Sequence, residues 1–249
     1  MNKKHIFDGV DAVCKAAADH ITVLSKKKIA EKGKFTIALS GGNTPRQLYE
    51  LLAQPFYANT IEWNDIFIFW SDERCVPASD QNNNSHMAFN SLLNKINIPA
   101  ENIFPVPVNF EPAKAASMYE QTLQAFFKQE LPAFDLILLG LGDNGHTASL
   151  FPYTSILQEK KHIVKEVFVE EVNAYRISFT SKLINNAGHI LFLVTGEAKA
   201  GIVEIIFSGT TDFEKYPVLL INPTNADPDW YLDHAATSQL NKNEQPSLS

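Results

Sequence analysis

The sequence predicts an α/β protein whose mostly parallel sheet is covered by helices on both faces. Short apolar runs of strand length alternate with longer stretches of helical periodicity along the 249 residues, which is typical of βαβ units. The run Leu136–Leu139 is apolar at every position, as expected of a strand buried on both faces of a parallel sheet. Residues 163–169 and 175–180 have the pattern of two short strands without a full helix between them, so a small antiparallel insertion is expected there.

The first half of the chain predicts a long surface helix followed by two strands and two further helices. Residues 9–32 carry apolar side chains at close to helical spacing, and Gly33 ends this helix. A strand at 35–39 leads through the stretch SGGNTP into a second helix, and residues 44–47 have the pattern of a capping box. Residues 61–70 predict a second strand, and a helix extends to about residue 93.

The second half continues the alternation around the central strand. Residues 103–108 predict a short strand or extended segment, and residues 111–130 a helix. After the antiparallel insertion, a strand at 189–195 is followed by a helix that ends near residue 207. A last strand is expected at 217–221 and a last helix at 226–240, and the polar residues 241–249 are expected to be frayed.

Composition restricts the class of protein. The chain is 45% hydrophobic and 20% charged, so it has the profile of a globular protein and not of a disordered, fibrous or membrane protein. Its net charge of −7 gives no support for a nucleic-acid or anionic membrane surface. Cys14 and Cys75 are too few for a disulfide scaffold, and no apolar run has the length of a signal or transmembrane segment. We therefore expect one soluble cytoplasmic domain over residues 1–249.

The central strand is followed by a glycine-rich stretch that presents one histidine. The strand ends at Gly140, and Gly142 and Gly145 allow the backbone to turn sharply and to approach a ligand closely. Because strand ends form the ligand crevice of open α/β sheets, His146 is a candidate chemical group at the mouth of such a crevice. The alternative is a histidine that only makes hydrogen bonds within a tight turn.

The same glycines also match a dinucleotide-binding fingerprint. Gly140, Gly142 and Gly145 have the spacing G-x-G-x-x-G after a strand, and Glu159 lies at about the distance of a ribose contact. That fingerprint requires a long helix directly after the third glycine, and Pro152 interrupts any such helix. The pattern therefore favours a chemical role for this loop over nucleotide binding.

Two further stretches are candidate anion sites. The SGGNTP stretch places backbone N–H groups and the positive end of a helix dipole where two glycines permit close approach, although a capped turn without a ligand would look the same. Arg74 follows the second strand, and its planar guanidinium suits a phosphate; the alternative is a solvated ion pair with Asp72. Lys199 lies in the first turn of a predicted helix, where the dipole disfavours a cation unless a negative group offsets it.

Together these stretches resemble the signature sequences of the 6-phosphogluconolactonase family: SGGNTP at 40–45, SDERCVP at 71–77 and LGLGDNGHTASLFP at 139–152, with VTGEAKA at 194–200 as a fourth match. The resemblance covers nearly the whole chain. It implies the Rossmann-like three-layer α/β/α fold shared with glucosamine-6-phosphate deaminase, ribose-5-phosphate isomerase and coenzyme A transferases. It also implies hydrolysis of 6-phospho-D-glucono-1,5-lactone to 6-phosphogluconate in the oxidative pentose phosphate pathway, with no cofactor and no metal.

The resemblance also assigns roles to residues. His146 would be the general base that activates water, and Asp143 would either orient its imidazole or be a turn residue. Such an ester requires one base with a pKa near neutral and donors for the developing oxyanion. Arg74 and Lys199 would bind the phosphate. The candidate substrate-binding residues are Ser40, Gly41, Gly42, Thr44, Asp72, Arg74, Gly145 and Lys199.

Two other functions are found on the same fold. A glucosamine-6-phosphate deaminase would carry a glutamate shortly after the histidine, and residues 147–158 contain no acidic residue. A non-catalytic sugar-phosphate sensor would bind in the same pocket, but no DNA-binding segment or basic face accompanies it. The expected partner is a small sugar-phosphate lactone, with no nucleic acid or membrane, for a monomer or weak homo-oligomer. The chain departs from the family pattern at residues 79–84, where only Asn84 keeps its position, so no role is assigned to that loop.

Overall fold

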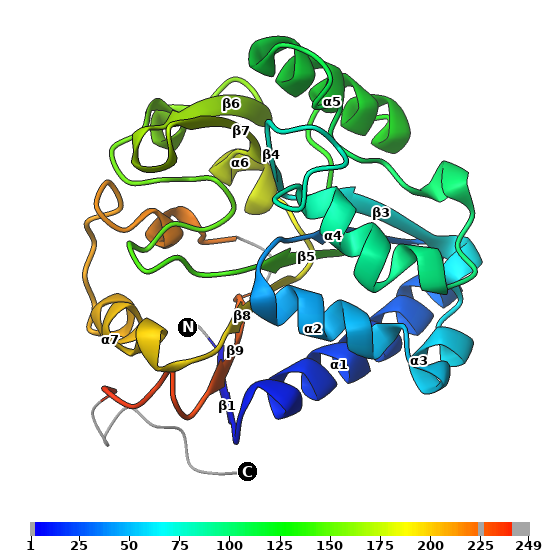
Figure 1. Cartoon of the computed structure of the whole chain (residues 1–249), viewed down its shortest axis with the longest axis horizontal. Coiled ribbons are helices and arrows are strands. Elements are labelled where there is room, and N and C mark those ends of the chain that lie inside the picture. Colours follow the sequence, from blue (N-terminus) through cyan, green and yellow to red (C-terminus); the bar gives the residue numbers. More distant parts are fainter. Residues whose placement is uncertain (1–2, 224–226, 241–249) are drawn as a thin grey trace.

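The computed structural model describes residues 3–223 and 227–240, and its centre is a six-stranded sheet (Figure 1). Every neighbouring pair of strands in this sheet is parallel. The strands are, in their order across the sheet, β1 (Lys3–Phe7), β9 (Asp229–Asp233), β8 (Ile190–Val194), β5 (Leu136–Leu139), β2 (Phe35–Leu39) and β3 (Ile66–Trp70). The mostly parallel sheet predicted from the sequence is confirmed.

Helices and a second sheet cover the two faces. Helix α1 (Val10–Lys32) packs against α2 (Asn43–Leu52) on one side, whereas α5 (Pro112–Phe127) lies on the other side of the sheet in Figure 1. The shorter helices are α3 (Pro55–Thr60), α4 (Asn84–Ser91), α6 (Ser181–Ile184) and α7 (Ala200–Phe207). This arrangement is the expected three-layer α/β/α sandwich.

The second sheet is small and antiparallel. It has the order β4 (Asp72–Arg74), β7 (Ala174–Phe179) and β6 (Val164–Val169). Strand β4 begins two residues after β3 ends, so the chain passes from the main sheet directly into the small one. The predicted antiparallel insertion at β6 and β7 is confirmed, but the SDER stretch is part of it and not a loop at a strand end. The register places Arg74 opposite Arg176.

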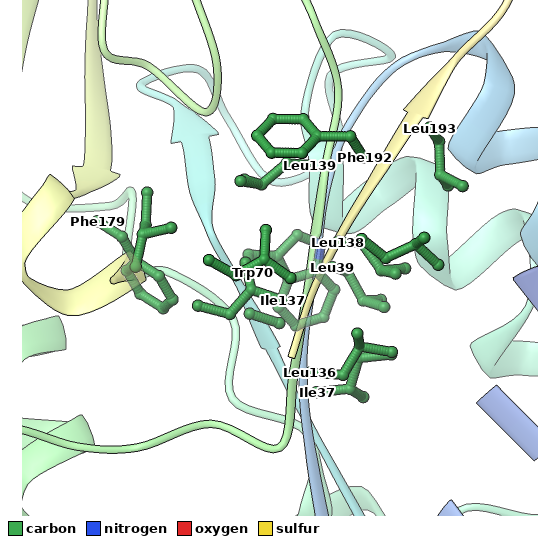
Figure 2. Close-up of a cluster of buried hydrophobic side chains, with 14 of the residues drawn as sticks. Ile37, Leu39, Trp70, Leu136, Ile137, Leu138, Leu139, Phe179, Phe192 and Leu193 are labelled. Atoms are coloured by element: carbon green, nitrogen blue, oxygen red, sulfur yellow. The ribbon is translucent and has the colours of Figure 1, made fainter. Parts of the chain in front are cut away.

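The central strand β5 is buried on both faces (Figure 2). Its four residues are each 0% exposed, and they lie between β2 and β8 in the sheet. Large side chains complete the surrounding core, among them Trp70, Phe179 and Phe192. Such a strand has little freedom to shift, because a close-packed interior resists displacement. The loop that begins at Gly140 therefore starts from a fixed point.

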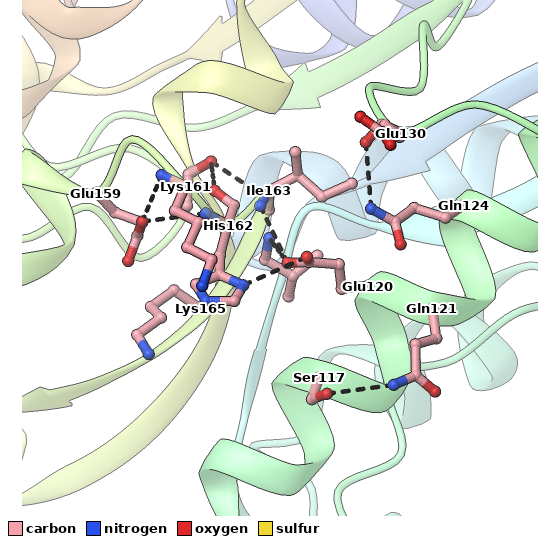
Figure 3. A network of polar contacts seen from close by, with 12 residues as sticks. Ser117, Glu120, Gln121, Gln124, Glu130, Glu159, Lys161, His162, Ile163 and Lys165 are labelled. Atoms are coloured by element: carbon pink, nitrogen blue, oxygen red, sulfur yellow. Dashed lines mark hydrogen bonds and ion pairs between the residues drawn. The ribbon is translucent and has the colours of Figure 1, made fainter.

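A polar network anchors the antiparallel hairpin to α5 (Figure 3). The carboxylate of Glu120 accepts hydrogen bonds from the backbone N–H groups of Ile163 at 3.0 Å and Val164 at 3.2 Å. Its other oxygen lies 3.3 Å from Nδ1 of His162. Because these backbone donors open β6, the network fixes the base of the hairpin that carries Arg176.

The C-terminal part of the predicted secondary structure is wrong in two places. Residues Pro217–Leu220 form a 3-10 turn and not a strand. The expected helix at 226–240 is instead strand β9 followed by turns, with residues 224–226 outside the described part of the chain. Parallel pairing of β9 with both β1 and β8 outweighs the local helical spacing of its apolar residues. The tail at 241–249, expected to be frayed, also lies outside the described residues.

Smaller differences occur near the N-terminal half. Strand β1 was not predicted, and β3 begins only at Ile66, after a 3-10 turn. The predicted capping box is also wrong: α2 begins after Gly42 with no side-chain cap. The Thr44 hydroxyl instead contacts that of Thr195 at 2.6 Å. Within the described residues, no helix has the length and apolar character needed to cross a membrane.

Candidate active site

A cavity of about 580 Å³ lies at the carboxyl ends of the parallel strands. Loops that follow β2, β5 and β8 line it together with strand β4, which comes directly after β3, as expected for the ligand crevice of an open α/β sheet. The structure brings together at this cavity the predicted residues Ser40, Gly41, Gly42, Thr44, Asp72, Arg74, His146 and Lys199. Asp143 and Gly145 belong to the same loop as His146 but do not line the cavity.

His146 is held against the cavity wall on two sides. Its imidazole stacks on the ring of Phe151, with 4.0 Å between the ring centroids. On its other flank is Gly142, whose N–H donates to the carbonyl of His146 at 2.8 Å and closes the turn. Gly145 has a φ of 79° and packs against Tyr216, so it shapes the turn and not the cavity surface.

Hydrogen bonds to Asn144 determine which nitrogen of His146 carries the proton. Oδ1 of Asn144 lies 3.2 Å from the backbone nitrogen of His146 and 2.6 Å from its Nδ1. The backbone N–H can only donate, so the group that faces it must be the amide oxygen. The Nδ1 atom that shares this oxygen must then be protonated, which leaves the lone pair of the neutral ring on Nε2.

The surroundings of His146 favour its neutral form. Burial lowers the pKa of the imidazole to about 4, and the positive charges of Arg176 and Lys199 act in the same direction. The carboxylates of Asp72 and Asp143 oppose this shift. The sequence led us to expect a base with a pKa near neutral, and the difference arises from desolvation of the ring. At neutral pH the imidazole is therefore uncharged and able to accept a proton.

Asp143 makes its contact with Lys199. Its carboxylate forms an ion pair with the ammonium group of that residue, so a negative group does offset the lysine near the start of α7. Asp143 is exposed, and the imidazole Nδ1–H donates its hydrogen bond to Oδ1 of Asn144 instead. The D-N-G sequence was a signal for the role of Asn144. In turns, Asn and Asp side chains accept a hydrogen bond from the backbone N–H two residues on, as Asn144 does from His146.

Two of the three arginines in the sequence meet at the cavity. Arg74 and Arg176 are directly opposite each other on the antiparallel strands β4 and β7. The Nε atoms of both are buried and have no hydrogen-bond partner in the described part of the chain. Burial, together with the charge of Arg74, lowers the pKa of Arg176. Two like charges side by side with unused donors form a site that an anion would stabilise.

Arg176 was missed by the sequence analysis, because its partner on β4 was assigned to a loop. Its guanidinium carbon lies 5.6 Å from the centroid of the Phe151 ring, which also stacks on His146. One aromatic ring thus contacts both the candidate base and a candidate anion-binding residue. A lone arginine in a strand of alternating apolar residues was the available signal.

Buried acidic residues hold the loop before α4. Oδ2 of Asp72 accepts from the Ser149 hydroxyl at 2.7 Å and lines the cavity. The carboxylate of Glu73 accepts from three backbone N–H groups, those of Arg74, Asn84 and Ser85. Burial nevertheless raises the pKa of Glu73 to about 7. These contacts tie the N-terminus of α4 to the strand that carries Arg74.

Asn84 lies against the glycine loop. Its Nδ2 donates to the carbonyl of Asp72 at 2.9 Å, and its Oδ1 occupies the position that a Cβ on Gly41 would approach to 2.0 Å. Gly41 is therefore required by close approach. The start of α2 carries no side-chain cap, so backbone N–H groups after Gly42 remain open to a ligand. No group of three potential metal ligands occurs within residues 3–223 and 227–240.

Comparisons with known proteins show similarity in sequence and in fold. The model of the family described as "Glucosamine-6-phosphate isomerases/6-phosphogluconolactonase" matches residues 8–230. A 6-phosphogluconolactonase of Nostoc sp. is 42% identical over 216 residues, which is 85% of this chain and 87% of the relative. The solved 6-phosphogluconolactonase from Trypanosoma cruzi superimposes with a TM-score of 0.85 at 27% identity, over 96% of this chain and 97% of the other. A monomeric glucosamine-6-phosphate deaminase has a TM-score of 0.82 at 21% identity, over 95% and 99% of the two chains, and shares the fold.

Proposed function

The chain belongs to the family of glucosamine-6-phosphate isomerases and 6-phosphogluconolactonases, and we propose how its site performs the lactonase reaction, with His146 as the general base. The reaction is hydrolysis of 6-phospho-D-glucono-1,5-lactone to 6-phospho-D-gluconate. The observation that carries the proposal is a neutral imidazole whose Nε2 lone pair is free to act beside a half-buried pair of arginines. The absence of an acidic residue from 147–158 argues against the ring-opening step of a deaminase.

The imidazole of His146 takes part in two proton transfers, first as a base and then as an acid. Nε2 of His146 takes a proton from water as the water oxygen attacks C1 of the lactone, and the carbonyl oxygen becomes an oxyanion. When the tetrahedral intermediate collapses, the bond from C1 to the ring oxygen breaks and the imidazolium returns its proton to that oxygen. The product is an open-chain carboxylic acid, which loses its proton to solvent. The hydrogen bond from Nδ1 to Asn144 keeps the ring in the required tautomer throughout.

The 6-phosphate binds to the cationic group formed by Arg74, Arg176 and Lys199. Both arginines have a buried Nε without a partner among the described residues, and a phosphate oxygen would satisfy it. Lys199 exchanges its ion pair with the exposed Asp143 for one with the phosphate. The same positive charges also lower the free energy of the oxyanion at C1, since opposite charge at short range is strongly favourable in a buried site.

Sugar hydroxyls fit the remaining polar groups of the cavity. Asp72 is buried, and its carboxylate has lone pairs beyond the one used by Ser149. The turn of Ser40, Gly41 and Gly42 offers backbone groups to the sugar at close range, because Gly41 has no side chain. A larger residue at this position would collide with Asn84.

A lactone assay tests the proposal. Because the substrate also hydrolyses without an enzyme, formation of 6-phosphogluconate must be measured above that background, with glucosamine 6-phosphate as a parallel substrate. We expect the native chain to hydrolyse the lactone and the His146→Asn variant to keep only a small residual rate. No ammonia should be released from the amino sugar. Ammonia release, or full lactone turnover by the variant, would overturn the proposal.

A further inference from the structure

A second hydrogen bond leaves Asn144 in the direction away from His146. Nδ2 of Asn144 lies 3.2 Å from each of the two carboxylate oxygens of Glu171. The amide nitrogen donates and the carboxylate accepts. Together with the bond from His146 Nδ1 to Asn144 Oδ1, this makes a chain of three side chains in which every donor points the same way.

Glu171 reaches this loop from a distant part of the fold. It lies in the 3-10 turn Glu170–Val172 at the tip of the hairpin between β6 and β7. Asn173 follows with a φ of 45° and turns the chain back into β7, which carries Arg176. One hairpin thus supplies Arg176 to the cavity. From its tip it also supplies the carboxylate of Glu171 to the loop that carries His146.

The two ends of the Asn144 amide are fixed by different partners. The backbone N–H of His146 holds the oxygen, and Glu171 holds the nitrogen. Without Glu171, the amide would keep one anchor and could rotate about it, so its oxygen would no longer be held on Nδ1. The imidazole could then turn, or exchange its proton between the two nitrogens.

We propose that Glu171 is a positioning residue for His146 and acts through the carboxamide of Asn144. This inference rests on the general-base role proposed above. Asn144 is neutral, so it offers the imidazolium of the reaction no opposite charge. The carboxylate at the far end of the chain adds to the charges of Asp72 and Asp143 by polarising the amide, since linked hydrogen bonds strengthen one another.

The size of the effect follows from exposure. Glu171 is on the surface, where solvent weakens a hydrogen bond to a charged group. We expect its removal to lower kcat by roughly three- to tenfold, well below the loss of about 10² to 10⁴ for removal of the base itself. The KM for the lactone should stay within about twofold, because Glu171 does not line the cavity.

Three variants in the full chain test the contact. Glu171→Ala removes both the hydrogen bond and the charge, whereas Glu171→Gln keeps an oxygen that can accept from Asn144 and loses only the charge. Glu170→Gln is the matched control, because Glu170 is the adjacent exposed carboxylate on the same turn. We expect kcat to fall most in Glu171→Ala, less in Glu171→Gln, and not in Glu170→Gln. Thermal unfolding of each variant shows that it is folded.

A spectroscopic measurement separates positioning from a general structural effect. The ¹⁵N chemical shifts of the His146 ring report which nitrogen carries the proton, and His146→Asn identifies the signals among the seven histidines. At pH 7 we expect a protonated Nδ1 and an unprotonated Nε2 in the native chain. In Glu171→Ala, the two shifts should move toward each other as the tautomers mix.

A double variant tests the route through Asn144. In Asn144→Asp a carboxylate contacts Nδ1 directly, so adding Glu171→Ala should lower kcat no further. An undiminished loss in the double variant would contradict the proposal. So would a loss of kcat in Glu171→Ala with unchanged ring shifts, or changed shifts with native kcat. If the native chain shows no lactonase activity, the proposed function fails, and the nitrogen shifts alone decide whether Glu171 positions His146.

Discussion

The backbone of Gly142 and the imidazole of His146 are in such close contact that no other residue fits at position 142. A Cβ built on Gly142 would lie 2.0 Å from Nδ1 and 2.1 Å from Cε1 of the ring. Neighbouring atoms essentially never approach a Cβ so closely, so the ring would have to leave its position. The opposite face of the imidazole is occupied by Phe151. The ring is therefore held between a glycine and an aromatic side chain.

Gly142→Ala is expected to abolish most activity by displacing His146. The loss of kcat should approach that of removing the base, about 10² to 10⁴, because a displaced imidazole no longer reaches the water. Gly201→Ala is the control: this residue is inside α7, where an added methyl meets only the side chain of Gln239 at 3.7 Å. The control should keep native kcat and gain about 0.5 to 1 kcal/mol in helix stability. Native turnover in Gly142→Ala would show that the position of the ring does not matter.

His146→Asn is expected to lower kcat by about 10² to 10⁴ and to leave KM nearly unchanged. In the proposed mechanism the base works in its neutral form, so kcat/KM of the native chain should rise as pH increases through the pKa of His146 and then become level. Burial lowers that pKa to about 4, so with an unphosphorylated lactone the rise should lie near pH 4. A bound phosphate dianion favours the imidazolium, which moves the rise in kcat to higher pH.

The control for this experiment is His234→Asn, which alters an exposed histidine whose side chain lies 3.6 Å from that of Asp8. It should keep both the rate and the pH profile. A His146→Asn variant that retains the rise near pH 4 would assign that titration to another group.

His146 is also expected to make the stability of the fold sensitive to acid. A histidine whose pKa is lower in the folded state binds fewer protons there than in the unfolded chain, so stability is full above about pH 6.5 and falls as pH decreases toward the folded pKa. At pH 4 the cost from His146 should be about 3 kcal/mol, at about 1.36 kcal/mol for each unit by which its pKa is lowered. His20 and His189, whose pKa values burial also lowers, act in the same direction. Denaturant unfolding gives the free energy of unfolding at pH 7 and at pH 4.5. This free energy should fall less between the two pH values in His146→Asn than in the native chain. An equal fall in both proteins would show that His146 does not cause the acid sensitivity.

The sequence predicted the parallel sheet well where each strand has its own local pattern. The uninterrupted apolar run of β5 is one example, and the long α1 with its C-terminal Gly33 is another. The prediction failed for β9, which is a strand because it pairs with β1 from the opposite end of the chain. That pairing is a property of the tertiary fold, and it outweighs the local spacing of Trp230 and Leu232.

The residues of the candidate site also fall into those that a local sequence pattern predicts and those that only the tertiary fold brings together. Ser40 directly follows β2, Arg74 belongs to β4 just after β3, and His146 lies in the loop that follows β5, so a rule about strand ends was enough to place them together. Arg176 and Glu171 are brought to the site by a hairpin that folds over from a second sheet. No local pattern near either residue specifies that docking.

Arg176→Met is expected to separate stability from phosphate binding. Arg176 is half-buried beside Arg74, and its buried Nε has no partner among the described residues, so an apolar side chain of similar length should stabilise the ligand-free protein by about 1 kcal/mol. The KM for the phosphorylated lactone should rise by roughly 10- to 100-fold, because a charge-assisted contact to phosphate is lost. Thermal unfolding with and without inorganic phosphate checks both effects: phosphate should raise Tm in the native chain and much less in the variant.

Arg46→Met is the matched control for this prediction. Arg46 is the third arginine of the sequence, is exposed on α2 and does not line the cavity. Its variant should respond to phosphate as the native chain does. A higher Tm without a change in phosphate response for Arg176→Met would remove Arg176 from the anion site.

Asp143→Asn distinguishes two roles for the carboxylate that pairs with Lys199. In the proposed mechanism, this ion pair of the ligand-free protein must break before Lys199 binds the substrate phosphate. Asp143 is 74% exposed, so the pair is worth little, and its removal should lower KM for the phosphorylated lactone by only about two- to fivefold. Because Asn144 makes the hydrogen bond to the imidazole, kcat should stay near the native value. The measurement is kcat and KM with phosphorylated and unphosphorylated lactones, and the unphosphorylated substrate should show no change in KM. A fall in kcat of tenfold or more with both substrates would instead mean that Asp143, once released from Lys199, orients His146 during the reaction.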